Sequence, residues 1–140
     1  MQLRCTVGLL AACSLHAYAR ECGQNEVEKK DISGCSSVKY TKYMGKQNAI
    51  WLGDALHHNP HLKVLDLHHT RFGDDDAIAI ANGLHNNTHL KRLHLQNNRI
   101  HDDGAVALGK ALAKNDALEF LSLSTNGVGD IGAGAIAEGT

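Results

Sequence analysis

Histidine is the residue type with the clearest capacity for chemistry in this chain, which has ten histidines among its 140 residues. Two imidazoles and one carboxylate hold zinc in several catalytic sites, where a further position stays open to water or substrate. Asp66, His68 and His94 would form such a set if their segments are neighbouring strands. The sequence therefore leaves open a His/Asp metal site, and also a binding activity that changes as histidines gain charge between about pH 5 and 7.

The remaining histidines and the acidic turns have a simpler interpretation. Four histidines recur in pairs 28 residues apart, as surface positions of a repeat do: His57 with His85, and His61 with His89. The Asp-rich segments 73–76 and 101–104 lack the spacing of a calcium loop and are predicted to cap helices. No H-E-x-x-H, G-x-S-x-G, P-loop or dinucleotide-binding motif occurs in the sequence. We therefore predict no enzyme activity, no cofactor and no metal.

A leucine pattern that returns every 28 residues organises the chain. Copies of LxxLxL begin at positions 62, 90 and 118, and flanking positions such as Arg71 and Arg99 keep the same interval. The leucines of the pattern are Leu62, Leu65, Leu67, Leu90, Leu93, Leu95, Leu118, Leu121 and Leu123. A fixed period of this length is typical of a solenoid, in which each unit buries its apolar face against the next. It favours binding to another macromolecule as the function.

Each copy changes its apolar spacing part-way along. Segment 62–67 ends with apolar residues two apart, as a short strand with one covered face does. Ala77, Ile80, Ala81 and Leu84 follow the i, i+3, i+4, i+7 spacing of a helix that packs one face on a core. The sequence therefore predicts an α/β solenoid in which strands and helices alternate.

The ends of the repeat region depart from its middle. Residues 45–59 match the helix of an earlier unit, but the 28-residue frame puts Gly34, Ser37 and Lys39 at the leucine positions, so the strand half of that unit is not recognisable. Segment 20–44 is therefore assigned as a polar N-terminal segment or cap. At the other end, the frame stops inside the third helix. The last strand is then an uncapped edge. The favoured interpretation is that the chain is a fragment of a larger receptor, regulator or effector, and the alternative is that a partner or a second copy covers this edge.

The repeat resembles a known family. The run from Leu90 to Ile100, LKRLHLQNNRI, followed by Gly104, Ala105 and Leu108, is similar to the ribonuclease-inhibitor-like leucine-rich repeats that also occur in NACHT-type receptors and the Ran GTPase-activating protein. The resemblance covers 45–140, assigned as a leucine-rich repeat domain of about three repeats. It implies a right-handed horseshoe with parallel strands on the concave face and helices outside. A GTPase-activating role of the Ran-regulator type is an alternative, which would need polar residues such as Arg92 or Asn97.

The side chains between the leucines are predicted to face the concave side, because neighbouring residues of a strand point to opposite faces. Arg92 and Phe120 are the expected dominant contacts, since arginine and aromatic residues are enriched among binding hot spots. A net charge of −1 gives no case for nucleic acid, so a protein partner is expected. The predicted surface is Val64, Asp66, His68, His69, Arg92, His94, Gln96, Asn97, Phe120, Ser122, Ser124 and Thr125.

The N-terminal segment 1–19 resembles a secretory signal peptide, with Arg4 before an apolar run and Ala17-Tyr18-Ala19 as the cleavage site. It is too short to span a membrane. Secretion would leave Cys22 and Cys35 as the cysteines of the mature chain, and in an oxidising compartment they are expected to pair. Asn86 would then be a glycosylation candidate within Asn-Asn-Thr. The alternative is an ordinary apolar segment on a cytoplasmic protein.

Overall fold

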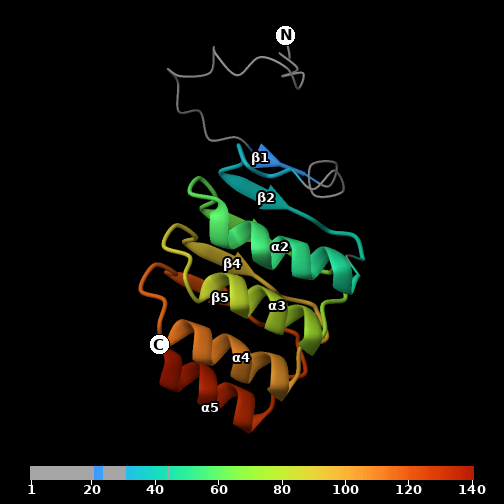
Figure 1. The fold of residues 1–140 in the computed structure, drawn as a ribbon. Coiled ribbons are helices and arrows are strands. Elements are labelled where there is room, and N and C mark those ends of the chain that lie inside the picture. The colour runs from blue at the N-terminus through green and yellow to red at the C-terminus, as the bar shows by residue number, and fades with distance from the viewer. Residues whose placement is uncertain (1–20, 24–30, 44) are drawn as a thin grey trace, which may run out of the picture.

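The computed structural model describes residues 21–23, 31–43 and 45–140, so the signal-like segment 1–19 lies outside the described residues. The strands form one parallel sheet in chain order: β1 (Glu21–Cys22), β2 (Ser37–Lys39), β3 (Val64–Asp66), β4 (Arg92–His94) and β5 (Phe120–Ser122). The helices are α2 (Lys46–His58), α3 (Asp74–Leu84), α4 (Asp102–Leu112) and α5 (Asp130–Gly139). Figure 1 shows the units stacked along one axis.

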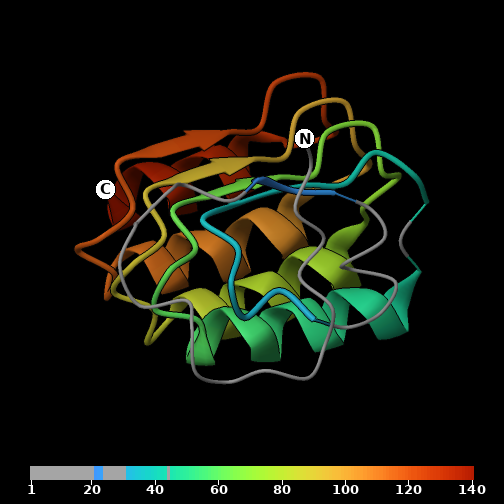
Figure 2. The ribbon, with the colours of Figure 1, turned by 90° about the horizontal axis from the view of Figure 1, so that it is seen from above.

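The sheet forms one layer of the molecule and the helices form the other, as Figure 2 shows from above. From β2 onward each strand is followed by a helix, and α2, α3 and α4 each return to the next parallel strand. Alternate positions along β3 and β4 show the expected burial, since Leu65 and Leu93 are fully buried between partly exposed or exposed neighbours. The predicted α/β leucine-rich repeat solenoid is confirmed.

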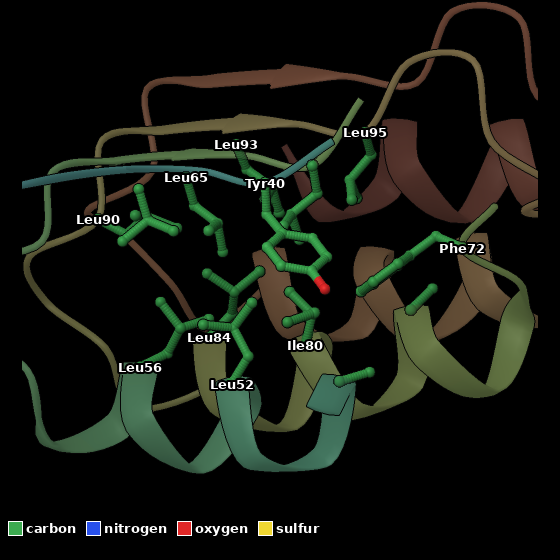
Figure 3. Packing of buried hydrophobic residues seen from close by; sticks show 14 of the residues in the cluster. Tyr40, Leu52, Leu56, Leu65, Phe72, Ile80, Leu84, Leu90, Leu93 and Leu95 are labelled. Carbon is green, nitrogen blue, oxygen red and sulfur yellow. The ribbon is translucent and has the colours of Figure 1, made fainter. Parts of the chain in front are cut away.

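The leucines of the first two ladders form the core between these layers, where Leu65, Leu93 and Leu95 meet Leu52, Leu84 and other side chains of the helix layer (Figure 3). Each fully buried leucine contributes about 1.5–3 kcal/mol relative to an exposed one. The third ladder is less covered, because no further unit in the described part of the chain packs on it. Its leucines are Leu118, Leu121 and Leu123, all partly buried.

The first unit has a strand that the 28-residue frame did not predict. β2 pairs with β3 so that Val38 lies beside Leu65, one residue out of the frame. Cys35, Val38 and Tyr40 are buried with the spacing of LxxLxL, and they take the places of the leucines. Because one residue is missing from this unit, the 28-residue frame does not reveal its strand: the sheet begins before position 45, within the segment assigned as a polar N-terminal segment or cap.

Buried asparagines tie each unit to the one before it. The side-chain amide of Asn87 donates to the carbonyl oxygen of Leu56 at 2.5 Å, while its own oxygen accepts from the backbone N–H groups of His89 at 2.9 Å and Leu90 at 2.7 Å. These bonds satisfy polar groups that the apolar core would otherwise leave unpaired. Asn59 and Asn115 bond in the same way.

Aspartates of the acidic turns cap helices, but two of them cap the helix of the next unit. Asp74, which opens α3, accepts from the N–H groups of His101 at 2.8 Å and Gly104 at 3.0 Å, at the start of α4. Its carboxylate also lies close to the positive end of that helix dipole. Asp76 instead caps its own helix by accepting from Gly73 N–H at 3.0 Å.

Glycine allows the helices to pack closely. A Cβ added to Gly53 in α2 would overlap the carbonyl oxygen of Ala79 in α3, and one added to Gly109 in α4 would overlap that of Ala135 in α5. The helix layer is therefore held together by backbone-to-backbone contact at these points.

Candidate interaction surface

The exposed face of the sheet carries two rows of side chains that cross the strands. The strand register places Val64, Arg92 and Phe120 side by side in the first row, with Ser37 next to Val64. Arg92 is exposed and Phe120 is 46% exposed, which is a large value for an aromatic ring on a sheet. The row therefore combines an exposed cation with apolar surface on both sides.

The second row is Asp66, His94 and Ser122. Asp66 Oδ1 and His68 Nδ1 lie 2.5 Å apart, with both side chains about three-quarters buried. The ring of His94 lies 5.0 Å from that of Phe120, centroid to centroid, at a tilt of 42°. The two histidines thus have different neighbours, since one binds a carboxylate and the other supports the aromatic ring of the first row.

The remaining predicted residues lie beyond the ends of the strands. His69, Asn97 and Thr125 have positive φ angles of 59°, 56° and 56°, in the left-handed region that non-glycine residues rarely adopt. Backbone bonds from His69 to Gln96 and from Asn97 to Ser124 continue the ladder here. These positions, with His68, Gln96 and Ser124, form a rim at the carboxyl ends of the strands rather than part of the flat face. The sequence pattern did not predict this turn.

The structure does not assemble the metal site that the sequence left open. Among residues 21–23, 31–43 and 45–140, no group of three or more histidine, cysteine or acidic side chains is placed to hold a metal ion. Asp66 and His68 do meet, but His94 packs on Phe120 instead. The arrangement offers hydrogen bonding and apolar contact.

Sequence reasoning missed one charged residue of this surface. Lys39 is exposed and lies beside Asp66 in the register of β2 and β3. The second row is therefore longer than predicted and begins with a cation. The spacing of Cys35, Val38 and Tyr40 could have revealed it, because CxxVxY repeats LxxLxL one residue out of frame.

Perturbed pKa values occur away from the surface. A hydrogen bond and the charge of Asp75 raise the pKa of Lys46, in α2. A hydrogen bond from Lys91 and its charge lower the pKa of Glu119, in the turn before β5. Both are exposed ion pairs between neighbouring units, and such pairs are weak.

The two predicted modification sites lie apart from the sheet face. Cys22 and Cys35 are joined in a disulfide, with their Cα atoms 5.7 Å apart. The bond links β1 to the residue that stands in the first leucine position of the β2 unit. Asn86 is exposed in the loop that follows α3.

A parallel sheet backed by helices, with buried leucines at a fixed interval and asparagines bridging the units, defines a leucine-rich repeat solenoid. Residues 58–81, 86–109 and 114–137, just over half of the chain, match the family described as leucine-rich repeat. The chain therefore belongs to the leucine-rich repeat family. No curated protein sequence matches it significantly.

Solved structures share this architecture. Leiomodin-1 actin-binding site 2 is 20% identical, with a TM-score of 0.59 over 82% of this chain and 86% of that one. The tropomodulin C-terminal domain from Caenorhabditis elegans is 14% identical, with a TM-score of 0.47 over 82% and 87%. An internalin from Listeria monocytogenes is 17% identical, with a TM-score of 0.43 over 80% of this chain and 35% of that one. At 20% identity the likeness to the leiomodin-1 structure is one of fold.

No helix within the described residues has the length and apolar character needed to cross a membrane.

Proposed function

We propose that this chain is a non-enzymatic protein-interaction module that binds its partner through the exposed face of the sheet. The observation that carries the proposal is the row of Val64, Arg92 and Phe120 on adjacent strands. A side chain that is both large and exposed on a rigid sheet can be buried by a partner with little loss of conformational freedom. The repeat stack supplies that rigidity.

The chemistry of the row indicates what kind of protein surface fits it. The Arg92 guanidinium can bind a carboxylate through two parallel hydrogen bonds. Phe120 and Val64, on either side, favour an apolar side chain next to that carboxylate. A protein segment with an acidic residue beside an apolar one satisfies both, and burial of the surrounding contacts would exclude water from the ion pair.

Nucleic acid is a poorer candidate for this surface. Phosphate binding needs several cations on one face, whereas the sheet rows hold Lys39 and Arg92 together with Glu21 and Asp66. The charges of the face therefore nearly balance. This mixture suits a protein partner with both polar and apolar contacts.

The test is partner capture with matched variants. Arg92→Ala and Phe120→Ala alter the sheet face, while Lys110→Ala and Ile78→Ala alter exposed positions on α4 and α3. We expect each sheet variant to weaken binding at least tenfold, since hot-spot truncations cost about 2 kcal/mol or more, and each helix variant to bind as the unchanged chain does. Loss of binding on the helix side alone would refute the proposal.

Actin is one defined probe for this experiment, because the leiomodin-1 structure of similar fold is described as an actin-binding site. Cosedimentation with filaments and fluorescence titration with monomers would measure binding by each variant. A partner that binds the sheet variants and the unchanged chain equally would contradict the assignment of the surface. Stimulation of GTP hydrolysis by a small GTPase, lost in Arg92→Ala, would instead support the Ran-regulator alternative.

We also propose that the C-terminal edge can pair with a second copy. Ile131 is 71% exposed, and the leucines of the third ladder are less covered than those of the first two. An unpaired strand beside uncovered apolar surface favours association. Sedimentation should show a concentration-dependent dimer, and Ile131→Lys should shift it to monomer. A monomer at all concentrations would reject this second contact.

A further inference from the structure

The loop that follows α3 differs from the equivalent segments of the other units at two positions. The loop after α3 reads Asn86-Asn87-Thr88. The equivalent residues of the other units are His58-Asn59-Pro60, which begin at the last residue of α2, and Lys114-Asn115-Asp116 after α4. The middle asparagine is common to all three because it bridges the units. The flanking residues Asn86 and Thr88 are what complete an N-x-Thr acceptor sequence for N-linked glycosylation.

The structure separates the roles of the two asparagines. Asn87 is buried and its side chain is fully engaged with Leu56, His89 and Leu90. Asn86 and Thr88 are exposed, and Thr88 Oγ1 makes a hydrogen bond of 3.1 Å with the neighbouring ring of His89. The asparagine that the sequence motif requires as acceptor is therefore the one the fold leaves accessible. Asn87, in contrast, holds the loop in place through its hydrogen bonds.

The surroundings of Asn86 have room for a sugar. An open cavity of about 470 Å³ lies beside it, lined by polar side chains that include Lys91, Lys114 and Asp116. Such groups can hydrogen-bond the hydroxyls of a first saccharide. Asn86 lies two residues after the end of α3 and is not part of either row on the sheet face.

The disulfide indicates the compartment in which this chemistry would occur. A bond between Cys22 and Cys35 persists where the surroundings are oxidising, as they are in the secretory pathway. The signal-like sequence of residues 1–19 favours the same route. We propose that Asn86 is an N-glycosylation site of the secreted chain. This assignment is independent of which protein the sheet face binds.

The modification is a group transfer from a lipid-linked oligosaccharide diphosphate. A bond forms between Asn86 Nδ2 and the anomeric carbon of the first sugar, and the bond from that carbon to the diphosphate oxygen breaks. The lipid diphosphate leaves with the electron pair, and the amide nitrogen loses one proton. The product carries a bulky, solubilising group on the surface.

The experiment is expression of the full-length chain in a eukaryotic secreting host, followed by mass measurement before and after peptide-N-glycosidase. We expect the secreted chain to lose mass on treatment, and peptide analysis to find Asp in place of Asn86. Thr88→Ala should remove the modification, while Thr88→Ser should keep it. A secreted chain with no enzyme-sensitive mass would overturn the proposal, as would a chain that stays in the cytosol unmodified.

Asn87→Ser separates the sequence motif from the fold. This variant keeps an acceptor sequence at Asn86 but removes the bridge to Leu56, so it should still be glycosylated in cell extracts while its yield in the medium falls. Thr88→Ala should show the opposite pattern, with no glycosylation in cell extracts and no fall in the yield in the medium. Glycosylation that persists in the Thr88→Ala chain would also refute the assignment. Partner capture with the enzyme-treated chain then tests the sheet face separately.

Discussion

The carboxylate of Asp102 accepts a hydrogen bond of 2.8 Å from the backbone N–H of Gly132, although the two residues belong to successive repeat units. The same oxygen accepts from Gly129 at 2.8 Å. Because the first N–H groups of a helix have no partner within it, α4 caps α5 through this side chain. Asp74 caps α4 in the same manner. Adjacent units are therefore joined at their helix ends as well as through the sheet and the core.

We predict that Asp102→Ala lowers the free energy of unfolding by about 1 kcal/mol, within the usual range of about 0.5–2 kcal/mol for loss of a cap. Asp130→Ala is the matched control, because Asp130 is the same position of the last unit and has no later helix to cap among the described residues. Urea denaturation of both variants measures the difference. Equal losses would show that the contact across units contributes nothing.

Removal of a bridging asparagine should cost more. Asn87→Ala leaves the buried carbonyl of Leu56 and the N–H groups of His89 and Leu90 without their partner, and each unsatisfied buried group costs about 1–3 kcal/mol. Asn82→Ala, at an exposed position of α3, is the control and should be near neutral. Thermal unfolding monitored by circular dichroism compares the two. A stable Asn87→Ala chain would mean that water replaces the bridge.

Replacement of two glycines of the helix layer by alanine should change the free energy of unfolding in opposite directions. Gly109→Ala forces a methyl group against the backbone of Ala135 and should destabilise the chain by about 1–3 kcal/mol. Gly134→Ala, in α5, meets nothing within 4 Å and should stabilise it by about 0.5–1 kcal/mol, because alanine is the better helix former. Unfolding curves of the two variants decide the matter. A loss at Gly134 would argue against this packing.

The ion pair of Lys91 and Glu119 predicts a small pH dependence of stability. Folding lowers the pKa of Glu119 from its ordinary value of 4.5, chiefly through the hydrogen bond from Lys91. The contribution is therefore present above that value and is lost as pH falls through the lower pKa of the folded state. Compared with Glu119→Gln, the unchanged chain should be slightly more stable at pH 7, and this difference should shrink as pH falls below 4.5. An advantage that does not shrink in acid would contradict this account.

Much of the fold could be predicted because the strand pattern, the helix pattern and the turn residues all indicate the same repeat unit. The leucine ladder, the helix stripe from Ala77 to Leu84 and the acidic turns all repeat at one interval, and the units they define are local. The first unit escaped prediction because a single missing residue moves Val38 out of frame. An alignment at a strict 28-residue interval misses a unit that is one residue shorter. In the structure the loop is shorter by that residue, and Val38 still lies beside Leu65.

The candidate surface could be predicted in part for the same reason. Alternation along a strand identifies Val64, Arg92 and Phe120 once the strands are in register. It cannot predict the left-handed backbone of His69 or Asn97, which depends on the turn that follows. Nor does it reveal that His94 lies against Phe120, since side-chain direction is set by neighbours from other units.

The close packing at Gly53 and Gly109 also sets the curvature of the molecule. Strands in a sheet lie about 4.7–4.9 Å apart, whereas packed helices are about 8–10 Å apart, and this difference bends a repeat stack toward its sheet. A side chain at Gly53 or Gly109 would overlap a carbonyl oxygen of the next helix, so glycine lets these helices approach closely. Residues on the far side of the molecule thus affect the shape of the sheet face. Larger side chains there would push the helices apart and tighten the arc, with no change to any residue on the face.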